Sequence, residues 1–298
     1  MLVAAHPENV RLLAQPHRLA AERFHLLARK LADELTYGTD PSRFTGPGVD
    51  YAQTRMMQLG DAVRSIDWRV TARTGRLHVK DYEASKRLGV YLLVDTSASM
   101  AASSTEVSKH DVAVWCAAVL AQLALNRRSP VCVISCAERD LPAAPSSTRA
   151  QVTAWIEALR RRSFVERTRL ADAVRRVETL AKHRAMVVVI SDLHDPEAAG
   201  AIARLGQRHD VIVIQPRDPA EGGELGAGFV RGGEAETGAL FLATAGQRFG
   251  GRGGAGSASG ATLVGAGLDH VVLRTDMPVM PALRRVLNAK RGPQRSAR

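Results

Sequence analysis

At residues 90–100 the chain reads VYLLVDTSASM, and this stretch decides its fold. An unbroken apolar run is typical of a strand that is buried on both faces, as the strands of parallel sheets are. A polar turn follows the run directly, and open α/β sheets place their sites at the carboxyl ends of their strands. The stretch therefore predicts a buried parallel strand with a functional site at its end.

The polar turn offers oxygen-bearing side chains at alternate positions, Asp95, Ser97 and Ser99. Side chains at this spacing can converge on one point and present a carboxylate and two hydroxyls to a hard cation such as Mg²⁺. The simpler alternative is a strand-end turn in which a serine caps the following helix. A second acid at a neighbouring strand end would favour the metal site.

Outward from this stretch, the apolar patterns predict strands and helices in alternation. Strands are predicted at 130–136, 185–190, 211–214 and 270–274, and helices at 109–126, 148–161, 170–183, 197–209 and 279–289. This alternation is typical of the α/β class. It predicts a doubly wound, mostly parallel sheet of the Rossmann type with right-handed crossovers.

The amino-terminal part is predicted to form a small β-containing subdomain beside the sheet. Apolar residues at helical spacing predict an amphipathic helix at 17–35, and residues 76–82 predict a strand. Between them, residues 60–73 alternate acids and arginines around one tryptophan. We expect Trp68 to be the core of this subdomain, inside a structural salt-bridge network of Asp61, Arg64, Asp67 and Arg73.

Composition divides the chain into three parts. Residues 1–88 hold the amino-terminal helix and the subdomain, residues 89–290 form the main α/β domain, and residues 291–298 form a basic tail. Within the main domain, residues 222–267 are rich in glycine. Because glycine loses more conformational freedom on folding than any other residue, we expect a mobile loop there.

The chain carries a formal net charge of +11, which is compatible with binding to nucleic acid or to an anionic lipid surface. The positive charge is scattered, and no stripe of Lys and Arg interleaved with aromatic residues is present in the sequence. We therefore expect no nucleic-acid partner. Salt-dependent binding to nucleic acid or anionic lipid stays as a third hypothesis for function.

The sequence predicts a cytoplasmic protein with no integral membrane segment. The longest apolar stretch, 112–125, is too short to cross a bilayer, and no signal peptide is recognisable. Cys116, Cys132 and Cys136 lack the spacing of a metal site. We expect them to be reduced residues of the core.

A second predicted strand, 185–190, also ends in an acid, Asp192. The carboxyl ends of adjacent parallel strands meet at one edge of a sheet, so Asp95 and Asp192 are expected to lie together. Thr168 directly precedes a predicted helix and is either its N-cap or a further hydroxyl of the site. The candidate ligands of Mg²⁺, or of Mn²⁺ or Ca²⁺, are Asp95, Ser97, Ser99, Thr168 and Asp192.

Three segments resemble the metal-ion-dependent adhesion site of von Willebrand factor A-type domains. They are Asp95-x-Ser97-x-Ser99, Thr168-x-Leu170-x-x-Ala173 and Ser191-Asp192-Leu193. Two carboxylates and three hydroxyls would leave a bound cation attractive to a further anion, such as an Asp or Glu of a protein partner. By linkage, the metal and the partner would strengthen each other's binding.

From about Arg55 onward the chain more closely resembles the bacterial domain-of-unknown-function family 58. That family's hallmark is Gly-Asp-Asp-x-Arg-x-Ile-Asp-Trp followed by Ala-Arg, and the chain matches it at Gly60-Asp61, Arg64, Ile66-Asp67-Trp68 and Ala72-Arg73. Two later segments also resemble it, Asp218-Pro219-Ala220-Glu221 and Leu273-Arg274-Thr275-Asp276. The chain departs from the family at Ala62, where the second acid is missing, and in its glycine-rich stretch. Many relatives carry amino-terminal membrane helices, which we do not expect here.

The resemblance implies a non-catalytic, metal-dependent protein-interaction module. It further implies an adaptor that works with a MoxR-type AAA+ ATPase in assembling or activating a protein complex or a metalloenzyme. The chain contains no Gly-x-x-x-x-Gly-Lys-Ser/Thr motif, so the ATP site would belong to the partner. The alternative is a Mg²⁺-dependent phosphoesterase or phosphotransferase with Asp95 as nucleophile, which would need a positioned Lys and further acids.

Overall fold

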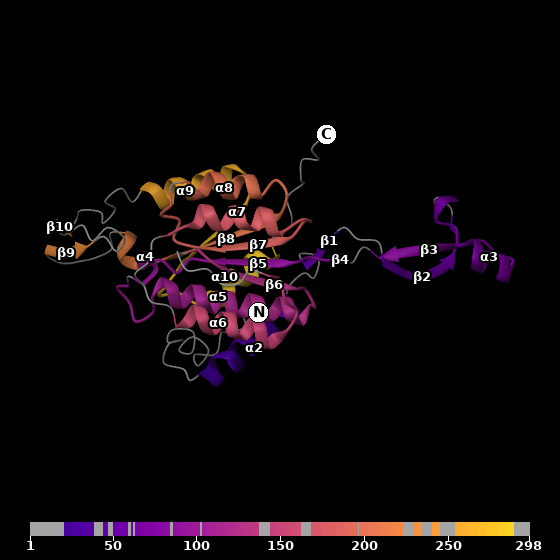
Figure 1. Ribbon diagram of the computed structural model, residues 1–298, viewed down its shortest axis with the longest axis horizontal. Coiled ribbons are helices and arrows are strands. Elements are labelled where there is room, and N and C mark those ends of the chain that lie inside the picture. Colours follow the sequence, from indigo (N-terminus) through magenta and orange to yellow (C-terminus); the bar gives the residue numbers. More distant parts are fainter. Residues whose placement is uncertain are drawn as a thin grey trace, which may run out of the picture.

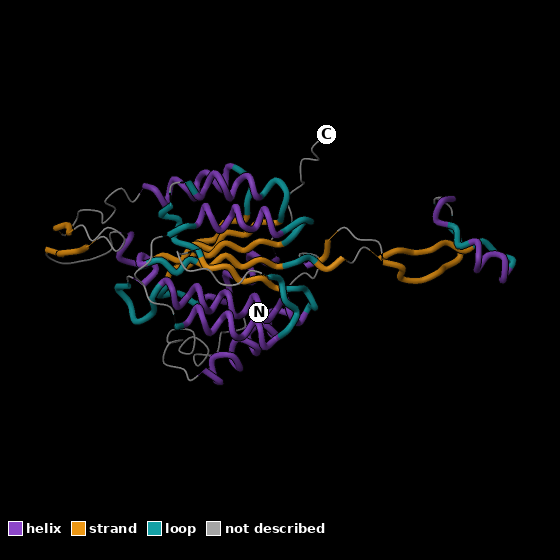
Figure 2. The backbone as a smooth tube through the Cα atoms, viewed as in Figure 1, coloured by secondary structure: helices purple, strands orange, loops and turns teal. Residues whose placement is uncertain are grey.

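The computed structural model shows an α/β body from which one narrow arm extends (Figure 1). The body is a sheet between two layers of helices, and the arm is a hairpin that carries a short helix (Figures 1 and 2). The structure describes residues 21–38, 44–46, 50–58, 61, 63–83, 86–101, 103–136, 144–161, 168–195, 197–222, 229–233, 240–244 and 254–288.

The central sheet has five parallel strands in the order β11–β8–β7–β5–β6. They are β5 (Val90–Val94), β6 (Val131–Ser135), β7 (Met186–Ile190), β8 (Asp210–Arg217) and β11 (Asp269–Arg274). Every residue of β5, β6 and β7 is buried, which explains their unbroken apolar sequences. The predicted parallel α/β sheet is confirmed, and β8 extends beyond the predicted 211–214.

Helices cover both faces of the sheet, an arrangement compatible with the Rossmann type. One layer contains α2 (Ala21–Gly38), α5 (Lys109–Asn126), α6 (Arg149–Arg160) and α10 (Val279–Asn288); the other contains α7 (Leu170–Leu180), α8 (Ala198–Leu205) and α9 (Gly254–Gly265). Within β5, Leu92 packs with the first layer and Leu93 with the second, because successive side chains of a strand point to opposite faces.

Helix α5 is the centre of its layer and is buried along most of its length. A capping box fixes its start: the Ser108 hydroxyl accepts from the N–H of Asp111, and the Asp111 carboxylate accepts from the N–H of Ser108. Helix α2 packs against α5, where the ring centroids of Phe24 and Trp115 lie 4.5 Å apart. The helix of the predicted 1–88 unit therefore packs with the core of the body.

The arm consists of residues 50–83. Its strands β2 (Asp50–Met56) and β3 (His78–Glu83) pair antiparallel, and η3 (Val63–Ser65) and α3 (Trp68–Thr74) lie between them. A short ladder between β1 (Thr45–Gly46) and β4 (Lys86–Arg87) lies where the arm meets the body. The predicted strand at 76–82 is confirmed as β3, whereas its partner β2 was not predicted.

The predicted core of the arm is wrong, because Trp68 is 66% exposed. Among the side chains of the arm that the structure describes, the buried apolar ones are instead Ile66 and Val79, which form an isolated antiparallel bridge. A two-stranded hairpin with one short helix has no second layer that could cover a tryptophan at the start of that helix.

The predicted salt-bridge network of the arm is also wrong. Asp61 forms a bidentate ion pair with Arg55, with both N–O distances at 2.8 Å. Asp67 accepts hydrogen bonds from two backbone N–H groups of α3, since the first N–H groups of a helix lack intrahelical partners. Arg73 forms no ion pair with a described residue, and the side chain of Arg64 lies outside the described part of the chain.

The described parts of the glycine-rich region contain regular structure, so they do not form the loop predicted at 222–267, whereas its mobility stays a prediction. Strands β9 (Phe229–Gly233) and β10 (Leu240–Thr244) pair antiparallel, and α9 packs on α8 and β11. A Cβ on Gly260 would lie 2.9 Å from Cε1 of His270, so glycine allows the helix to approach the strand closely. The predicted tail at 291–298 lies outside the described residues.

The three cysteines are buried and unpaired, as predicted. Burial raises the pKa of the Cys116 thiol to about 12, so this residue stays a neutral thiol of the core. In the described part of the chain, no helix combines the length and the apolar character needed to cross a membrane.

Replacing Phe24 by Ala is expected to lower the free energy of unfolding by about 3–5 kcal/mol, because a buried ring beside Trp115 is lost. Urea unfolding followed by circular dichroism measures the change. The control is Leu26→Ala in the same helix, a side chain that is 65% exposed. Its loss is expected to cost about 0.5 kcal/mol or less. Equal losses in the two variants would contradict the packing of α2 on the body.

Candidate functional site

The candidate site lies at the carboxyl ends of β5 and β7, which are neighbours in the sheet. Their register pairs Val94 with Ile190, so the next residues, Asp95 and Ser191, also lie side by side. The Ser191 hydroxyl donates to Oδ2 of Asp95 at 2.6 Å, and the backbone N–H of Ser97 donates to Oδ1 at 3.0 Å. The strand order reverses direction at β5, which is where doubly wound sheets bind ligands.

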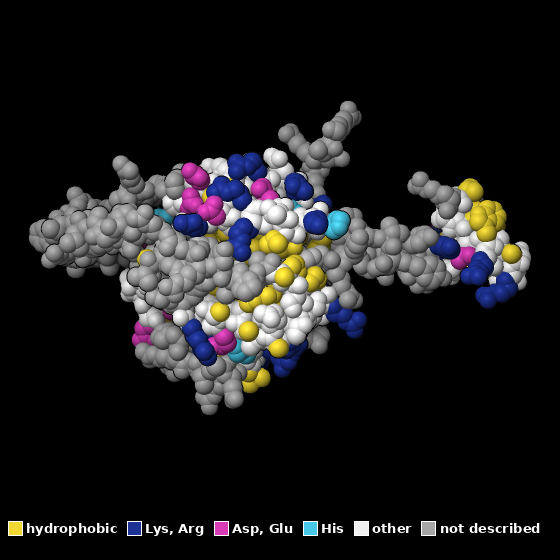
Figure 3. Space-filling model, in the orientation of Figure 1, with side chains coloured by type: hydrophobic (Ala, Val, Ile, Leu, Met, Phe, Trp, Pro, Cys, Tyr) yellow, Lys and Arg dark blue, Asp and Glu magenta, His cyan; other side chains and the backbone are white. Residues whose placement is uncertain are grey.

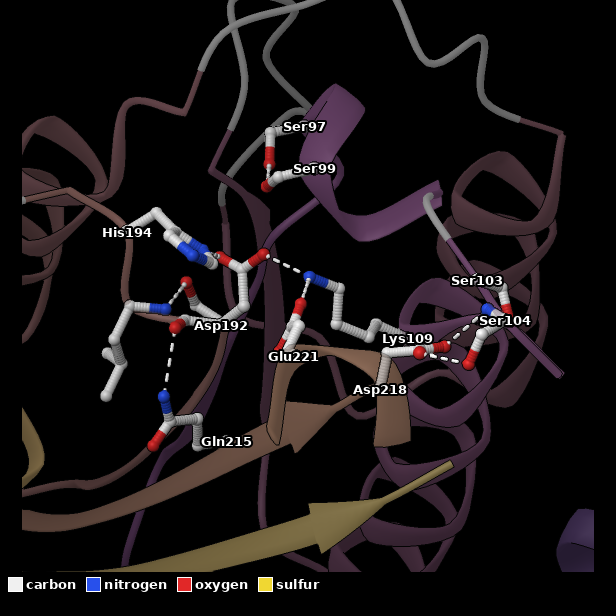
Figure 4. A network of polar contacts seen from close by, with 12 residues as sticks. Ser97, Ser99, Ser103, Ser104, Lys109, Asp192, His194, Gln215, Asp218 and Glu221 are labelled. Atoms are coloured by element: carbon white, nitrogen blue, oxygen red, sulfur yellow. Dashed lines mark hydrogen bonds and ion pairs between the residues drawn. The ribbon is translucent and has the colours of Figure 1, made fainter. Parts of the chain in front are cut away.

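Asp95 is fully buried, and burial changes its acidity. Burial raises the pKa of the Asp95 carboxyl to about 7, and the nearby Asp192 carboxylate adds to the rise. The hydroxyl oxygens of Ser97 and Ser99 lie 3.0 Å apart (Figure 4). The structure thus brings together the acid and the two hydroxyls of the turn after β5.

Asp192 lies at the same edge, where two basic side chains hold its carboxylate (Figure 4). Nζ of Lys109 lies 2.8 Å from Oδ2 and also binds the carboxylate of Glu221. Nδ1 of His194 lies 2.9 Å from Oδ1, close enough for an ion pair, although Oδ1 receives no aligned hydrogen bond. Burial acts to raise the pKa of Asp192, but His194 and Lys109 outweigh it and keep this pKa below its usual range.

The ammonium of Lys109 is a buried cation, with 2% of its side chain exposed. Burial acts to lower its pKa, but the carboxylates of Asp192 and Glu221 raise it overall, so the group is charged. Lys109 is the first residue of α5, an end of the helix where the macrodipole disfavours a cation. Its two carboxylate partners offset this cost.

The turn after β7 has an unusual backbone. Leu193 has a φ of 62°, a left-handed conformation that is uncommon for a residue other than glycine. Its N–H donates to the Ser191 hydroxyl at 3.0 Å, and Nε2 of Gln215 donates to the carbonyl of Asp192 at 3.0 Å. These bonds fix the turn so that the Asp192 carboxylate points toward Lys109 (Figure 4).

Thr168 is half-buried and lies just before α7. The next residue, Arg169, donates its N–H to the carbonyl of Cys136 at 2.8 Å, and Cys136 donates its own N–H to Val94 at 2.9 Å. These bonds hold the segment beside the ends of β6 and β5, the edge at which Thr168 was predicted to lie. The alternative that Thr168 is the N-cap of α7 is wrong, because Arg169 occupies that position.

Three charged residues near this edge were not predicted to belong to the site, Lys109, Asp218 and Glu221. Asp218 accepts the N–H of Ser104 at 2.7 Å and also binds its hydroxyl, which ties the end of β8 to the segment before α5. Two sequence signals point to them. Asp218 and Glu221 belong to one of the segments that resemble the family, and a lysine that opens an apolar helix is stabilised by a nearby acid, because the helix dipole disfavours a cation there.

The oxygen atoms at this edge that could bind a cation belong to carboxylates and hydroxyls. Among the described residues, no group of three or more His, Cys, Asp and Glu side chains is arranged to hold a metal ion. A cation bound here would therefore need hydroxyl oxygens in addition to Asp95 and Asp192.

In buffer with EDTA, the free energy of unfolding of the wild type is expected to include a term from Asp95 that falls as pH rises from about 4 to above 7. The native state keeps the Asp95 proton to a pKa of about 7, whereas the unfolded chain releases it near the ordinary value of 3.8. Asp95→Asn removes this term, so its stability relative to the wild type is expected to increase with pH over this range.

Urea unfolding at several pH values measures this difference. Asp172→Asn, which changes a half-exposed acid on α7, is the control and is expected to follow the wild type. A stability difference between Asp95→Asn and the wild type that does not change with pH would contradict the raised pKa of Asp95.

Comparisons with known proteins agree with the resemblance to the domain-of-unknown-function family 58 that the arm motif carries. Uncharacterized proteins of Mycobacterium bovis and Mycobacterium tuberculosis are each 28% identical to the chain over 225 residues, 68% of its length, and the chain spans 65% of theirs. A crystal structure of an uncharacterized membrane-spanning protein from Vibrio fischeri matches 65% of this chain and 93% of that one, at 14% identity and with a TM-score of 0.24. The model of the family described as protein of unknown function DUF58 matches residues 53–249. The chain therefore belongs to the DUF58 family.

Proposed function

We propose that this protein is a non-catalytic, metal-dependent protein-interaction module whose site is the edge formed by the ends of β5 and β7. The main support is the convergence there of a carboxylate and two hydroxyls, from Asp95, Ser97 and Ser99. Asp192 follows the neighbouring strand and supplies a second carboxylate. Such sets of oxygen donors suit hard cations, namely Mg²⁺, Mn²⁺ or Ca²⁺.

The residues at this edge fit a cation of that kind. Asp95 and Asp192 would supply carboxylate oxygens, and Ser97, Ser99 and Thr168 would supply hydroxyls. Oδ1 of Asp192 is buried and receives no aligned hydrogen bond, so a cation would compete there only with His194, whose Nδ1 lies 2.9 Å away. Asp95 would lose its proton beside a cation, because an opposite charge counteracts the rise in pKa that burial causes. When bound, the cation would offer an open coordination position to an anionic side chain.

Lys109 reduces the negative charge of the site, since its ammonium already binds Asp192 and Glu221. We therefore expect weak metal affinity without a partner, with a Kd on the order of 0.1–1 mM. A carboxylate from an Asp or Glu of the partner would improve the charge balance around the cation. Metal and partner would then strengthen each other's binding.

For the partner we propose a MoxR-type AAA+ ATPase, with this protein as its adaptor in assembling or activating a protein complex or a metalloenzyme. This part of the proposal rests on the resemblance set out for the sequence. The chain has no phosphate-binding Gly-x-x-x-x-Gly-Lys-Ser/Thr motif of its own, so energy from ATP would enter through the partner.

One observation favours the second candidate function, a Mg²⁺-dependent phosphoesterase or phosphotransferase with Asp95 as nucleophile. Lys109 places beside Asp192 the kind of cation that such enzymes use on phosphate. The interaction module is favoured instead because the ammonium of Lys109, the group that would hold a phosphate, is already bound by two carboxylates.

Separate isothermal titrations of purified protein with Mg²⁺, Mn²⁺ and Ca²⁺ test the metal site. We expect weak binding to the wild type and none to Asp95→Ala, because the variant loses one of the two carboxylates. Retention of a MoxR-type ATPase from native lysate, by each protein with Mg²⁺ or with EDTA, tests the partner. We expect retention only by the wild type with Mg²⁺.

Asp172→Asn is the matched control for both measurements and is expected to behave as the wild type, because its carboxylate pairs with Arg175 on α7. Wild-type protein that binds none of the three cations would contradict the metal site. Equal retention of the ATPase in all four conditions would contradict a metal-bridged partner. Mg²⁺-dependent hydrolysis of a phosphoester that is lost in Asp95→Asn would establish the second candidate function.

Replacing Lys109 by Met is expected to raise the affinity for Mg²⁺ by about tenfold, because Asp192 loses the ammonium that competes with the metal. In EDTA the same variant is expected to be about 3–5 kcal/mol less stable than the wild type, since the buried Asp192 carboxylate loses its ammonium partner and keeps only His194. Titration calorimetry and urea unfolding measure the two effects. The exposed Lys182→Met is the control. Unchanged Mg²⁺ affinity in Lys109→Met would contradict the competition but not the metal site.

A further inference from the structure

The arm presents exposed apolar side chains that the candidate site does not use. Among the described residues, eight large hydrophobic side chains are exposed, and four of them lie on the arm. These four form what we call the apolar patch: Met56, Val63, Trp68 and Leu77, each at least 50% exposed. Apolar side chains gathered on a small projecting element indicate a surface that another molecule covers.

Backbone contacts within the arm hold the apolar patch in place. The N–H of Met57 donates to the carbonyl of Leu77 at 2.9 Å, which sets the end of β2 beside the start of β3. Val63 and Trp68 lie on either side of Ile66 in the sequence, and Ile66 is bridged to β3. Figure 3 shows hydrophobic side chains at the tip of the arm with Lys and Arg side chains beside them.

The arm also carries arginines whose charge no described residue balances. Arg69, Arg73 and Arg76 are exposed, and none of them forms an ion pair with a carboxylate in the described part of the chain. The described acids near them are engaged elsewhere, since Asp61 binds an arginine of β2 and Asp67 caps α3. A surface that is apolar and positive is complementary to one that is apolar and acidic.

We propose that the arm docks into an acidic, apolar groove on a partner protein. Trp68 would be the apolar anchor, and Arg69 and Arg73 would bind carboxylates at the rim of the groove. Tryptophan and arginine are the residue types that most often carry the binding energy of protein interfaces. Arg69 and Arg73 are four residues apart and therefore lie on one face of α3.

The stiffness of α3 favours a protein partner over an anionic bilayer. The helix is capped at both ends, by Asp67 at its start and by Gly75 at its end, where φ is 67°. The backbone positions of Arg69 and Arg73 are therefore fixed relative to each other. A fixed spacing of planar guanidinium groups suits carboxylates at fixed positions on a protein, whereas lipid head groups diffuse and respond to net charge.

The arm and the candidate site lie at opposite ends of β5. Strand β4 precedes the start of β5, and Asp95 follows its end. Figure 1 accordingly shows the arm at one end of the body and α4 (Ala98–Ala101) at the other. A partner on the arm would leave the metal site open. The arm proposal therefore goes beyond the proposed function and does not depend on a metal.

A phage-displayed peptide library selected on the whole protein tests the docking surface. We expect the selected peptides to combine Glu or Asp with Leu, Phe or Trp. In fluorescence anisotropy, Trp68→Ala and the double variant Arg69→Glu/Arg73→Glu are each expected to bind a selected peptide at least about tenfold more weakly. Changing the acids of that peptide to Lys is expected to restore binding to the double variant. Asp95→Ala is expected to bind as the wild type, which separates this test from the metal site.

Two control variants on the body of the protein make the same kinds of change as the arm variants. Met277→Ala removes another exposed apolar side chain, and Arg204→Glu/Arg208→Glu makes the same charge change at the same spacing. Circular dichroism checks that every variant is folded. A selection without acidic apolar peptides, or equal binding to wild type and arm variants, would overturn the proposal. Binding that needs the arm but occurs only with vesicles of equal parts phosphatidylcholine and phosphatidylglycerol would also overturn the proposal, because the arm would then bind membranes.

Discussion

The buried ion pair between Lys109 and Asp192 is the interaction on which the candidate site depends. It joins the first residue of α5 to the turn after β7, and through Glu221 it reaches the segment that follows β8. A buried charge without its partner costs several kcal/mol, so these three segments are held together by one ammonium. The position of α5 at this edge therefore follows from charge balance as well as from the apolar packing of its remaining length.

Charge balance also explains why two buried acids at one edge differ in acidity. Asp192 lies against the cationic Lys109 and against His194, whose pKa the contact with Asp192 raises. The described hydrogen-bond partners of Asp95, Ser191 and Ser97, are neutral. Burial therefore dominates at Asp95 and raises its pKa, while ion pairing dominates at Asp192 and lowers it. Neighbouring acids with opposite shifts are typical of functional sites.

The body could be predicted from the sequence because its strands are buried on both faces and their patterns are local. The sequence also predicted that Asp95 and Asp192 lie together, because the carboxyl ends of adjacent parallel strands meet at one edge of a sheet. The errors concern contacts between segments distant in the sequence. The role of Lys109 depends on Asp192, an acid 83 residues away in the sequence. The need for glycine at position 260 depends on His270 of β11, which lies close to it. Trp68 was assigned to a core because of its residue type, but burial needs a covering layer that the hairpin lacks.

The family match includes residues from both ends of the molecule, the arm and the candidate site. It covers residues 53–249, which include nearly all of the arm and the ends of β5 and β7, whereas α2 and α10 lie outside it. Those two helices pack on the core and supply none of the residues of either surface. The matched part would thus contain both the proposed metal site and the proposed docking arm, which lie at opposite ends of β5. Such a spacing would let an adaptor hold two proteins without either excluding the other, because neither surface shares residues with the other.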